Sequence, residues 1–233
     1  MTEFAGGNTA KLYCLQALDA LASSGRLQRI IDLGAGSASL FVPLLRAHPQ
    51  VHYVAVEPDA EACRAAERNL SGLPAEVVQG FAWDLETEPA DAVVSFSVLE
   101  HVHDRPRYFG AVARHVTPDG RVWMNVDSGH FTHPLRRDRV KNAIGRGSWF
   151  QRFVSESELR ALAAGAGLEI VEAKSFNTEL KLLYRLAPEG AQAAFTQRWL
   201  DFELAANELL PPYTDAHAPY FMTRNVVLRQ RGD

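Results

Sequence analysis

Short segments that are almost continuously apolar alternate with amphipathic segments through the first half of this chain. Such apolar segments, rich in Val and Ile, are typical of strands buried on both faces of a parallel sheet. Alternating strands and helices form right-handed crossovers, so the sequence predicts an α/β fold with a doubly wound sheet. The strands are predicted over Arg29–Gly34, Val51–Glu57, Ala75–Gly80, Asp91–Ser97 and Arg121–Val126, and the helices over Ser39–Ala47, Asp59–Leu70 and Arg107–Val116.

The rest of the chain fits a single domain with insertions. It has 233 residues, 47% of them hydrophobic, which is enough for one core. We expect an N-terminal cap over residues 1–28, a lid insertion over 127–152 and a helical insertion over 177–220. Beyond the lid, the sequence predicts a helix that opens with a capping box at Ser155, and strands over Leu168–Phe176 and Phe221–Gln230.

The last insertion contains a predicted helix over residues 188–210 with an apolar stripe. Packing against the core is the usual role of such a stripe, and the wall of a substrate pocket or a dimer seam is the alternative. A monomer and a homodimer therefore both remain open. The stripe, at spacings of 4, 3, 4 and 3, consists of Phe195, Trp199, Phe202, Ala206 and Leu209.

Charge is distributed unevenly along the sequence. The formal net charge is −4, so no overall basic field indicates a nucleic-acid partner. Residues 127–152 nevertheless carry six basic side chains against two acidic ones, Asp127 and Asp138. This stretch is interpreted either as a patch for an acidic group on a substrate or as a solvated loop.

The sequence carries no sign of export or of a membrane span. Cys14 and Cys63 form no CxxC pair, so no disulfide framework is predicted. No apolar run approaches 18 residues, and the N-terminus lacks the pattern of a signal peptide. We therefore expect a cytoplasmic protein without membrane association.

A glycine-rich turn follows the first predicted strand. The strand ends at Asp32, and Gly34 and Gly36 then precede a helix. Glycine can adopt positive φ angles and lets a ligand approach the backbone closely. The turn suits a nucleotide-like ligand at the carboxyl ends of the strands, although Ser39 replaces the third glycine of a dinucleotide fingerprint. Many strand-to-helix turns carry glycine for steric reasons alone, which is the alternative interpretation of this turn.

The second predicted strand ends in an acidic residue, Glu57, 21 residues after Gly36. A carboxylate at this point can accept hydrogen bonds from both hydroxyls of a ribose. A solvated glutamate at the strand end is the alternative. The turn and the carboxylate together fit either NAD, whose pyrophosphate prefers a full glycine loop, or S-adenosylmethionine, which has no phosphate.

These motifs resemble those of class I S-adenosylmethionine-dependent methyltransferases. DLGAGSA (Asp32–Ala38) is similar to the family motif E/DxGxGxG, with Ala38 in place of the last glycine, and VAVEPD (Val54–Asp59) resembles the motif with the ribose-binding acid. QGFAWD (Gln79–Asp84) resembles the adenine-contacting loop, with Phe81 where aspartate is usual. DAVVSFSVLEHVHDRPRYF (Asp91–Phe109) is similar to small-molecule enzymes of the ubiquinone and secondary-metabolite type.

The resemblance covers about Ile30–Val126 and implies both a fold and an activity. The fold is a Rossmann-like sheet of seven strands, mostly parallel, with an antiparallel last strand. The activity is transfer of the methyl group of S-adenosylmethionine to an oxygen or nitrogen, less often a carbon, of a small molecule. The implied cofactor-binding residues are Asp32, Gly34, Ala35, Gly36, Glu57, Pro58, Gly80, Phe81, Ala82, Ser97 and Val98.

Two further details of the adenine and metal motifs follow from the resemblance. The adenine amino group is expected to contact Asp84 or the backbone of Phe81 and Ala82, and Phe81 or Trp83 is expected to flank the ring. Some ubiquinone-type members bind a metal through ExxEH, but Ser97 replaces the first acid here. Two ligands make a poor site, so we predict no metal.

Histidine is the best candidate for a general base if the acceptor is a hydroxyl, because its pKa lies near neutral pH. We favour His130, in the segment expected to meet the substrate, followed by His101; His103 and His133 also follow predicted strands. For each histidine alone, a structural role is the simpler interpretation. The N-terminal segment Gly6–Leu21 is expected either to fold over the cofactor, with contacts from Asn8, Lys11 or Tyr13, or to form a plain packing helix.

Two other classes of function compete with methyl transfer. An NAD-dependent oxidoreductase is weakened by Ser39 in the glycine turn and by the lack of a Ser/Tyr-x-x-x-Lys relay. A protein that binds S-adenosylmethionine without transferring its methyl group, or a cyclase on the same fold, is the other, because fold does not fix chemistry.

Overall fold

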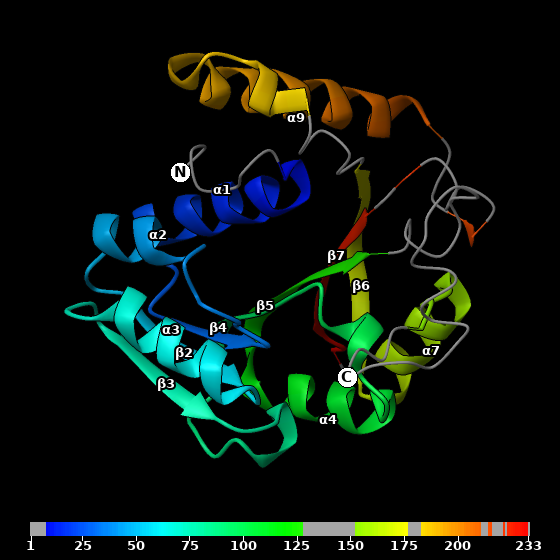
Figure 1. Ribbon diagram of the computed structural model, residues 1–233. Coiled ribbons are helices and arrows are strands. Elements are labelled where there is room, and N and C mark those ends of the chain that lie inside the picture. The colour runs from blue at the N-terminus through cyan, green and yellow to red at the C-terminus, as the bar shows by residue number, and fades with distance from the viewer. Residues whose placement is uncertain are drawn as a thin grey trace, which may run out of the picture.

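The computed structural model describes residues 8–127, 152–176, 183–210, 214–215, 221 and 223–232. Its centre is a seven-stranded sheet in the order β3-β2-β1-β4-β5-β7-β6 (Figure 1). The strands are β1 (Arg29–Leu33), β2 (His52–Glu57), β3 (Ala75–Gln79), β4 (Ala90–Phe96), β5 (Val116–Asp127), β6 (Leu168–Phe176) and β7 (Thr223–Gln230).

Strand order reverses between β1 and β4. β1 pairs in parallel with β2 on one side and with β4 on the other, and β4 pairs in parallel with β5. β7 runs antiparallel to both β5 and β6. The predicted Rossmann-like sheet, mostly parallel with an antiparallel last strand, is therefore confirmed. A ligand is expected at the carboxyl edge, where the order reverses.

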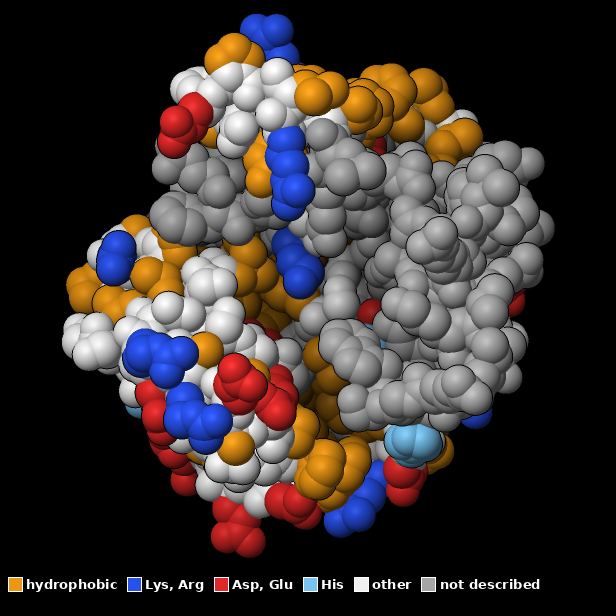
Figure 2. All heavy atoms as spheres, viewed as in Figure 1, with side chains coloured by type: hydrophobic (Ala, Val, Ile, Leu, Met, Phe, Trp, Pro, Cys, Tyr) orange, Lys and Arg blue, Asp and Glu red, His pale blue; other side chains and the backbone are white. Residues whose placement is uncertain are grey.

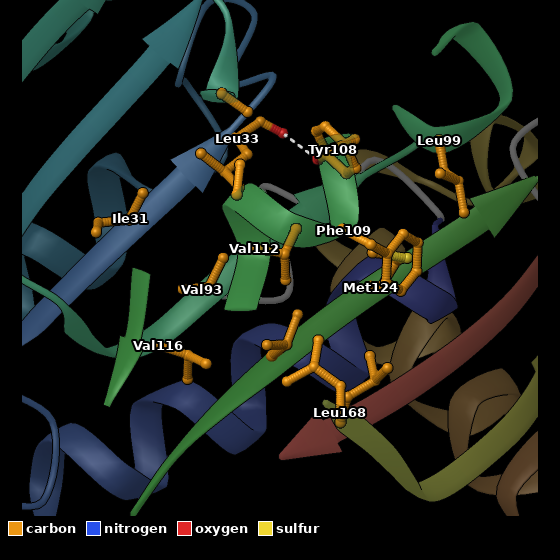
Figure 3. Close-up of a cluster of buried hydrophobic side chains, with 14 of the residues drawn as sticks. Ile31, Leu33, Val93, Leu99, Tyr108, Phe109, Val112, Val116, Met124 and Leu168 are labelled. Atoms are coloured by element: carbon orange, nitrogen blue, oxygen red, sulfur yellow. Dashed lines mark hydrogen bonds between the residues drawn. The ribbon is translucent and has the colours of Figure 1, made fainter. Parts of the chain in front are cut away.

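Alternate residues of the central strands enter different cores on the two faces of the sheet. On one face, Ile30 and Val94 pack beneath the helices α1 (Thr9–Ser23), α2 (Val42–Ala47) and α3 (Ala60–Leu70). On the other, Ile31 and Val93 pack with Phe109 and Val112 of α4, as Figure 3 shows. This two-sided burial explains why the strands read as continuous apolar runs. The helices of the second face are α4 (Arg105–His115) and α7 (Glu156–Gly165).

Side-chain caps fix where four of the described helices begin, and Asp104 caps α4 at 3.1 Å. Asn8, Asp59 and Ser155 accept hydrogen bonds from the backbone N–H three residues on, at 3.0, 2.8 and 3.0 Å. These bonds satisfy N–H groups that have no partner inside the helix. Of the capping box predicted at Ser155, the bond from the Glu158 N–H to the Ser155 hydroxyl is present, whereas the Glu158 carboxylate accepts hydrogen bonds from two arginines.

Two local features differ from the prediction. The predicted helix over Ser39–Ala47 begins only at Val42, after a turn. The strand predicted over Arg121–Val126 begins earlier, at Val116, and its pairing with β4 skips from Ala90↔Val116 to Ala92↔Arg121. The four residues between Val116 and Arg121 bulge from the ladder within one continuous strand.

The predicted helix over residues 188–210 is α9 (Gln192–Leu209), which lies across the outer side of α1 in Figure 1. The interpretation of its apolar stripe as core packing is wrong for Phe202 and Leu209, which are 62% and 86% exposed. A different face of α9 is buried: Leu200 packs in an apolar cluster with α1, and the Thr9 hydroxyl of α1 donates to the carboxylate of Glu203. The pocket-wall and dimer-seam interpretations stay predictions.

No helix among the described residues is long and apolar enough to cross a membrane.

One buried arginine fastens the chain around residue 152 to the turn after β4. Arg105 is 1% exposed, and its guanidinium donates to the Phe153 carbonyl at 3.1 Å and to the Glu158 carboxylate at 2.7 Å. It also donates to the Leu99 carbonyl at 3.3 Å, and the Arg152 N–H donates to the Glu100 carbonyl at 2.8 Å. A buried charge of this kind must keep all its partners to remain favourable.

We expect Arg105→Met to lower the free energy of unfolding by about 3 kcal/mol, because the carbonyls and the carboxylate lose a common donor. Arg114→Met, in the same helix but exposed, is the matched control and should change it by about 0.5 kcal/mol or less. Urea unfolding measures both. Equal effects of the two substitutions would contradict the anchoring role of Arg105.

Candidate functional site

The glycine turn at the end of β1 is held against β2 by its backbone. The N–H groups of Gly34 and Ala35 both donate to the Val56 carbonyl, at 2.8 and 3.1 Å. Gly34 and Gly36 have φ angles of +84° and +54°. A Cβ on Gly34 would lie 2.4 Å from Cγ2 of Val98, so only glycine fits beside the turn that follows β4.

Ala38, which departs from the family motif, takes the backbone conformation of the glycine it replaces. Its φ is +54°, a left-handed value that residues with a Cβ rarely adopt. Its N–H donates to the Ala35 carbonyl at 2.9 Å, and the residue is buried. The shape of the motif is therefore kept although its last glycine is absent.

The predicted ribose carboxylate meets the glycine turn. Oε2 of Glu57 accepts a hydrogen bond from the Gly36 N–H at 2.8 Å, and Oε1 accepts one from the Asp59 N–H at 3.1 Å. Each oxygen of an ionised carboxylate can accept a second bond. The side chain is thus held by the backbone while both oxygens keep capacity for a pair of ligand hydroxyls.

The loop after β3 joins the same edge. The Gly80 N–H donates to the Glu57 carbonyl at 3.0 Å. The ring of Phe81 stacks on that of Trp83, with centroids 4.9 Å apart and planes 7° apart, and the Arg107 guanidinium lies over Trp83 at 4.8 Å. Because Phe81 is still 49% exposed, it offers a flat apolar surface backed by Trp83.

The turn after β4 completes the row. Ser97 has a φ of +60°, and its N–H donates to the Asn125 carbonyl at 2.9 Å. Its hydroxyl donates to Oδ1 of Asn125 at 3.0 Å. Below this turn the Tyr108 hydroxyl donates to the Leu33 carbonyl at 3.4 Å, the dashed line in Figure 3. Helix α4 is thereby fastened to the end of β1.

Asp32 is buried at the base of the glycine turn. It is 4% exposed and accepts a hydrogen bond from the Tyr53 hydroxyl at 2.6 Å. Burial raises the pKa of Asp32 to about 7, although the Tyr53 bond and the positive charge of Lys11 oppose the rise. Tyr53 pairs with Ile30 in the ladder and so lies diagonally across from Asp32 on one face. Sequence reasoning missed this partner.

The predicted cofactor residues thus gather at one edge, the carboxyl ends of β1, β2, β3 and β4. Pro58 is exposed beside Glu57, and Ala82 is buried behind Phe81. His101 is half-buried in η3 (Leu99–His101), where its N–H donates to the Val98 carbonyl at 2.8 Å. His130 and His133 lie outside the described residues, as does nearly all of the predicted lid. The molecular face in Figure 2 is hollowed near its centre, partly against hydrophobic side chains.

The N-terminal residues take different roles from one another. The Asn8 side chain caps α1, and the Tyr13 hydroxyl donates to the carboxylate of Glu172 on β6. The positive charge of Lys11 lowers the pKa of Asp32 and so opposes the effect of burial. Within the described part of the chain, no three His, Cys, Asp or Glu side chains form a group that could hold a metal ion.

A glycine turn, a backbone-anchored carboxylate and an exposed aromatic ring lie together at the switch point of a doubly wound sheet, the arrangement expected of a nucleoside-binding protein. The profile of the family described as a methyltransferase domain matches residues 7–173, so the chain belongs to that family. It is similar to a ubiquinone biosynthesis O-methyltransferase of Rhodopseudomonas palustris, with 27% identity over 192 residues, covering 78% of this chain and 71% of the relative.

Two solved structures share the fold. One, an S-adenosylmethionine-dependent methyltransferase from Clostridium acetobutylicum, has a TM-score of 0.62 at 12% identity and covers 97% of this chain and 92% of that one. The other, the cyclopropane synthase MmaA2 from Mycobacterium tuberculosis, has a TM-score of 0.60 at 16% identity, with coverages of 91% and 82%. These structures show the shared fold, and the family match makes the chain an S-adenosylmethionine-dependent methyltransferase, with S-adenosylmethionine as its cofactor.

The buried carboxyl group of Asp32 predicts a pH-dependent stability. The pKa of Asp32 is about 7 in the folded protein and near 4 in an unfolded chain, so folding favours the protonated carboxyl group. The contribution of Asp32 to the free energy of unfolding is therefore full below pH 4 and is lost as the pH rises through 7. From pH 5 to pH 8 the free energy of unfolding should fall by roughly 2 to 3 kcal/mol more in the wild type than in Asp32→Asn. Urea unfolding at several pH values measures this, and parallel profiles would refute it.

Proposed function

We propose that this chain transfers the methyl group of S-adenosylmethionine to an oxygen or nitrogen atom of a small molecule by in-line displacement. The observation that carries the proposal is the Glu57 carboxylate, which the Gly36 N–H fixes at 2.8 Å at the point where strand order reverses. A carboxylate placed there suits the two hydroxyls of a ribose and repels a 2′-phosphate.

The other residues of the edge have distinct parts in holding the cofactor. The open backbone at Gly34, Ala35 and Gly36 leaves room for the methionine portion, and an ionised Asp32 attracts its ammonium group. The exposed face of Phe81, supported by Trp83, flanks the adenine, and the turn at Ser97 and Val98 forms the opposite wall. Asp84 is less suited to the adenine amino group, because it lies 3.7 Å from the Arg107 guanidinium.

Catalysis rests mainly on positioning. S-adenosylmethionine supplies a methyl group on a positively charged sulfur that leaves as a neutral thioether, so no residue has to protonate the leaving group. The chain must instead align the acceptor atom with the methyl carbon, which alone can supply much of the acceleration. His101, half-buried one turn beyond Val98, is a candidate to accept a proton from a hydroxyl, and His130 is the other candidate from the sequence.

Oxygen is favoured as the acceptor atom, because the similar Rhodopseudomonas protein is described as an O-methyltransferase. The six basic residues within 127–152 favour an acidic group on the substrate, with a solvated loop as the alternative. The cyclopropane synthase has the same fold, so the fold alone does not determine which reaction is catalysed.

The carboxylate role of Glu57 predicts a specific loss of affinity. Glu57→Gln should weaken binding of S-adenosylhomocysteine about tenfold or more, because a charge-assisted pair of hydrogen bonds to the ribose is lost. Glu76→Gln, exposed on the neighbouring strand β3, is the control and should bind as the wild type. Titration calorimetry measures both, and unchanged affinity of the Glu57 variant would refute the ribose contact.

The glycine turn allows a second test with a closely matched control. Gly36 and Gly25 both have positive φ angles, +54° and +73°, and a Cβ on either would meet no atom within 4 Å. Alanine therefore introduces similar backbone strain at both, about 1 kcal/mol. Only Gly36 lies at the proposed site, so Gly36→Ala should weaken S-adenosylhomocysteine binding at least tenfold and Gly25→Ala should not. Equal affinities would argue against a ligand at this turn.

The competing classes of function give different results in the same titrations. Binding of NADH, seen as enhanced nicotinamide fluorescence, with no heat from S-adenosylmethionine would favour an oxidoreductase. Tight binding of S-adenosylmethionine without transfer of a labelled methyl group to any small molecule of a cell extract would favour a protein that does not methylate. Labelled product that requires Glu57 supports the proposal.

A further inference from the structure

A chain of polar side chains, buried except at its first member Ser97, crosses the face of the sheet that α1 covers. The Ser97 hydroxyl donates to Oδ1 of Asn125 at 3.0 Å, and Nδ2 of Asn125 donates to Oδ1 of Asn225 at 2.7 Å. Nδ2 of Asn225 then donates to the Ala10 carbonyl at 2.7 Å and to Sγ of Cys14 at 3.4 Å. Donors and acceptors run in one direction, from the turn after β4 to the first turns of α1.

These asparagines stand among apolar neighbours. Asn125 and Asn225 are opposite each other in the β5–β7 ladder and are 1% and 2% exposed. Two residues away on the same strands, Trp123 and Val227 belong to the apolar core beneath α1. Replacing a satisfied buried pair by apolar side chains of similar shape can be nearly neutral for stability. Packing alone therefore does not explain two asparagines at these positions.

One end of the chain fixes a strained turn at the proposed site. Ser97 has a φ of +60°, a conformation that costs a non-glycine residue free energy and persists only where surrounding bonds hold it. Both the N–H and the hydroxyl of Ser97 bond to Asn125. In this conformation the side chain of the next residue, Val98, lies against Gly34. A Cβ added to Gly34 would be only 2.4 Å from Cγ2 of Val98.

The other end fixes the first turn of α1. Asn225 holds the carbonyl of Ala10, next to Lys11, the residue whose charge acts on Asp32. The Cys14 thiol stays protonated, because burial raises its pKa, so it offers Asn225 a neutral acceptor. The two asparagines thus connect the turn at Val98 with the helix that carries Lys11.

We propose that Asn125 and Asn225 are positioning residues that hold the turn at Ser97 and the first turn of α1 in register with each other, so that both sides of the cofactor site are set together. The proposal rests on the function proposed above. It assigns to the antiparallel strand β7, whose residues do not border the glycine turn, a part in binding S-adenosylmethionine.

A double-mutant cycle between the ends of the chain tests this proposal. Ser97→Ala and Asn225→Leu should each weaken S-adenosylhomocysteine binding about tenfold in calorimetry. Ser97 and Asn225 are joined only through Asn125 in these bonds, so the combined variant should lose far less than the product of the single losses. Losses that multiply would overturn the relay, because independent structural defects behave in that way.

A matched variant separates positioning from general packing. Val227→Ala removes apolar contact from the same strand and the same face. It should lower the thermal midpoint at least as much as Asn125→Leu combined with Asn225→Leu, yet keep wild-type affinity within about twofold. Equal loss of affinity from Val227→Ala would overturn the proposal. If the asparagine variants bind S-adenosylhomocysteine as tightly as the wild type, the positioning role is wrong but the proposed function stands. If the wild type itself does not bind, the proposed function is wrong as well.

Hydrogen exchange on the wild-type protein gives an answer even if the variants do not fold. Binding of S-adenosylhomocysteine should slow amide exchange both at Ser97 and Val98 and in the first two turns of α1. Protection of the turn after β4 with no change in α1 would overturn the coupling.

Discussion

The hydrogen bond from the Gly36 N–H to the Glu57 carboxylate is the interaction on which the site depends. It joins the ends of β1 and β2 at the point where the sheet reverses its order, and it holds a charged oxygen there without filling its remaining capacity. An anion bound to a backbone donor is pre-oriented, so a ligand with paired hydroxyls does not have to order it. The surrounding turns can then be understood as supports for this one contact.

Much of the fold could be predicted because strands buried on both faces appear in the sequence as short, continuous apolar segments. β1, β2, β4 and the second part of β5 are buried on both faces, and each appears in the sequence as a continuous apolar run. Glu57 could be found because a strand end and a fixed spacing from a glycine turn are visible without coordinates. Residues such as Phe81 and Ala38 were also placed by position in a motif, although neither has the usual side chain.

What the sequence did not reveal are pairings that depend on strand register. Tyr53 meets Asp32, and Asn125 meets Asn225, because the ladder sets them diagonally or directly opposite, over separations of 21 and 100 residues. The face of α9 is a related case. Its apolar stripe has helical spacing, yet α9 buries a different face, with Leu200 in an apolar cluster and Glu203 bonded to Thr9, and Phe202 is exposed. Hydropathy alone does not weigh a buried hydrogen bond against exposed apolar area.

Backbone strain is concentrated at the edge of the sheet that we propose holds the cofactor. Among the described residues, the two with positive φ that are not glycine are Ala38 and Ser97, and both adjoin the glycine turn or the turn after β4. At the amino edge, a similar bend is made by Gly25, where no Cβ opposes it. Strained conformations persist where neighbouring bonds over-determine them. The buried bonds of Asn125 are therefore best understood as the means by which a strained turn becomes a fixed wall.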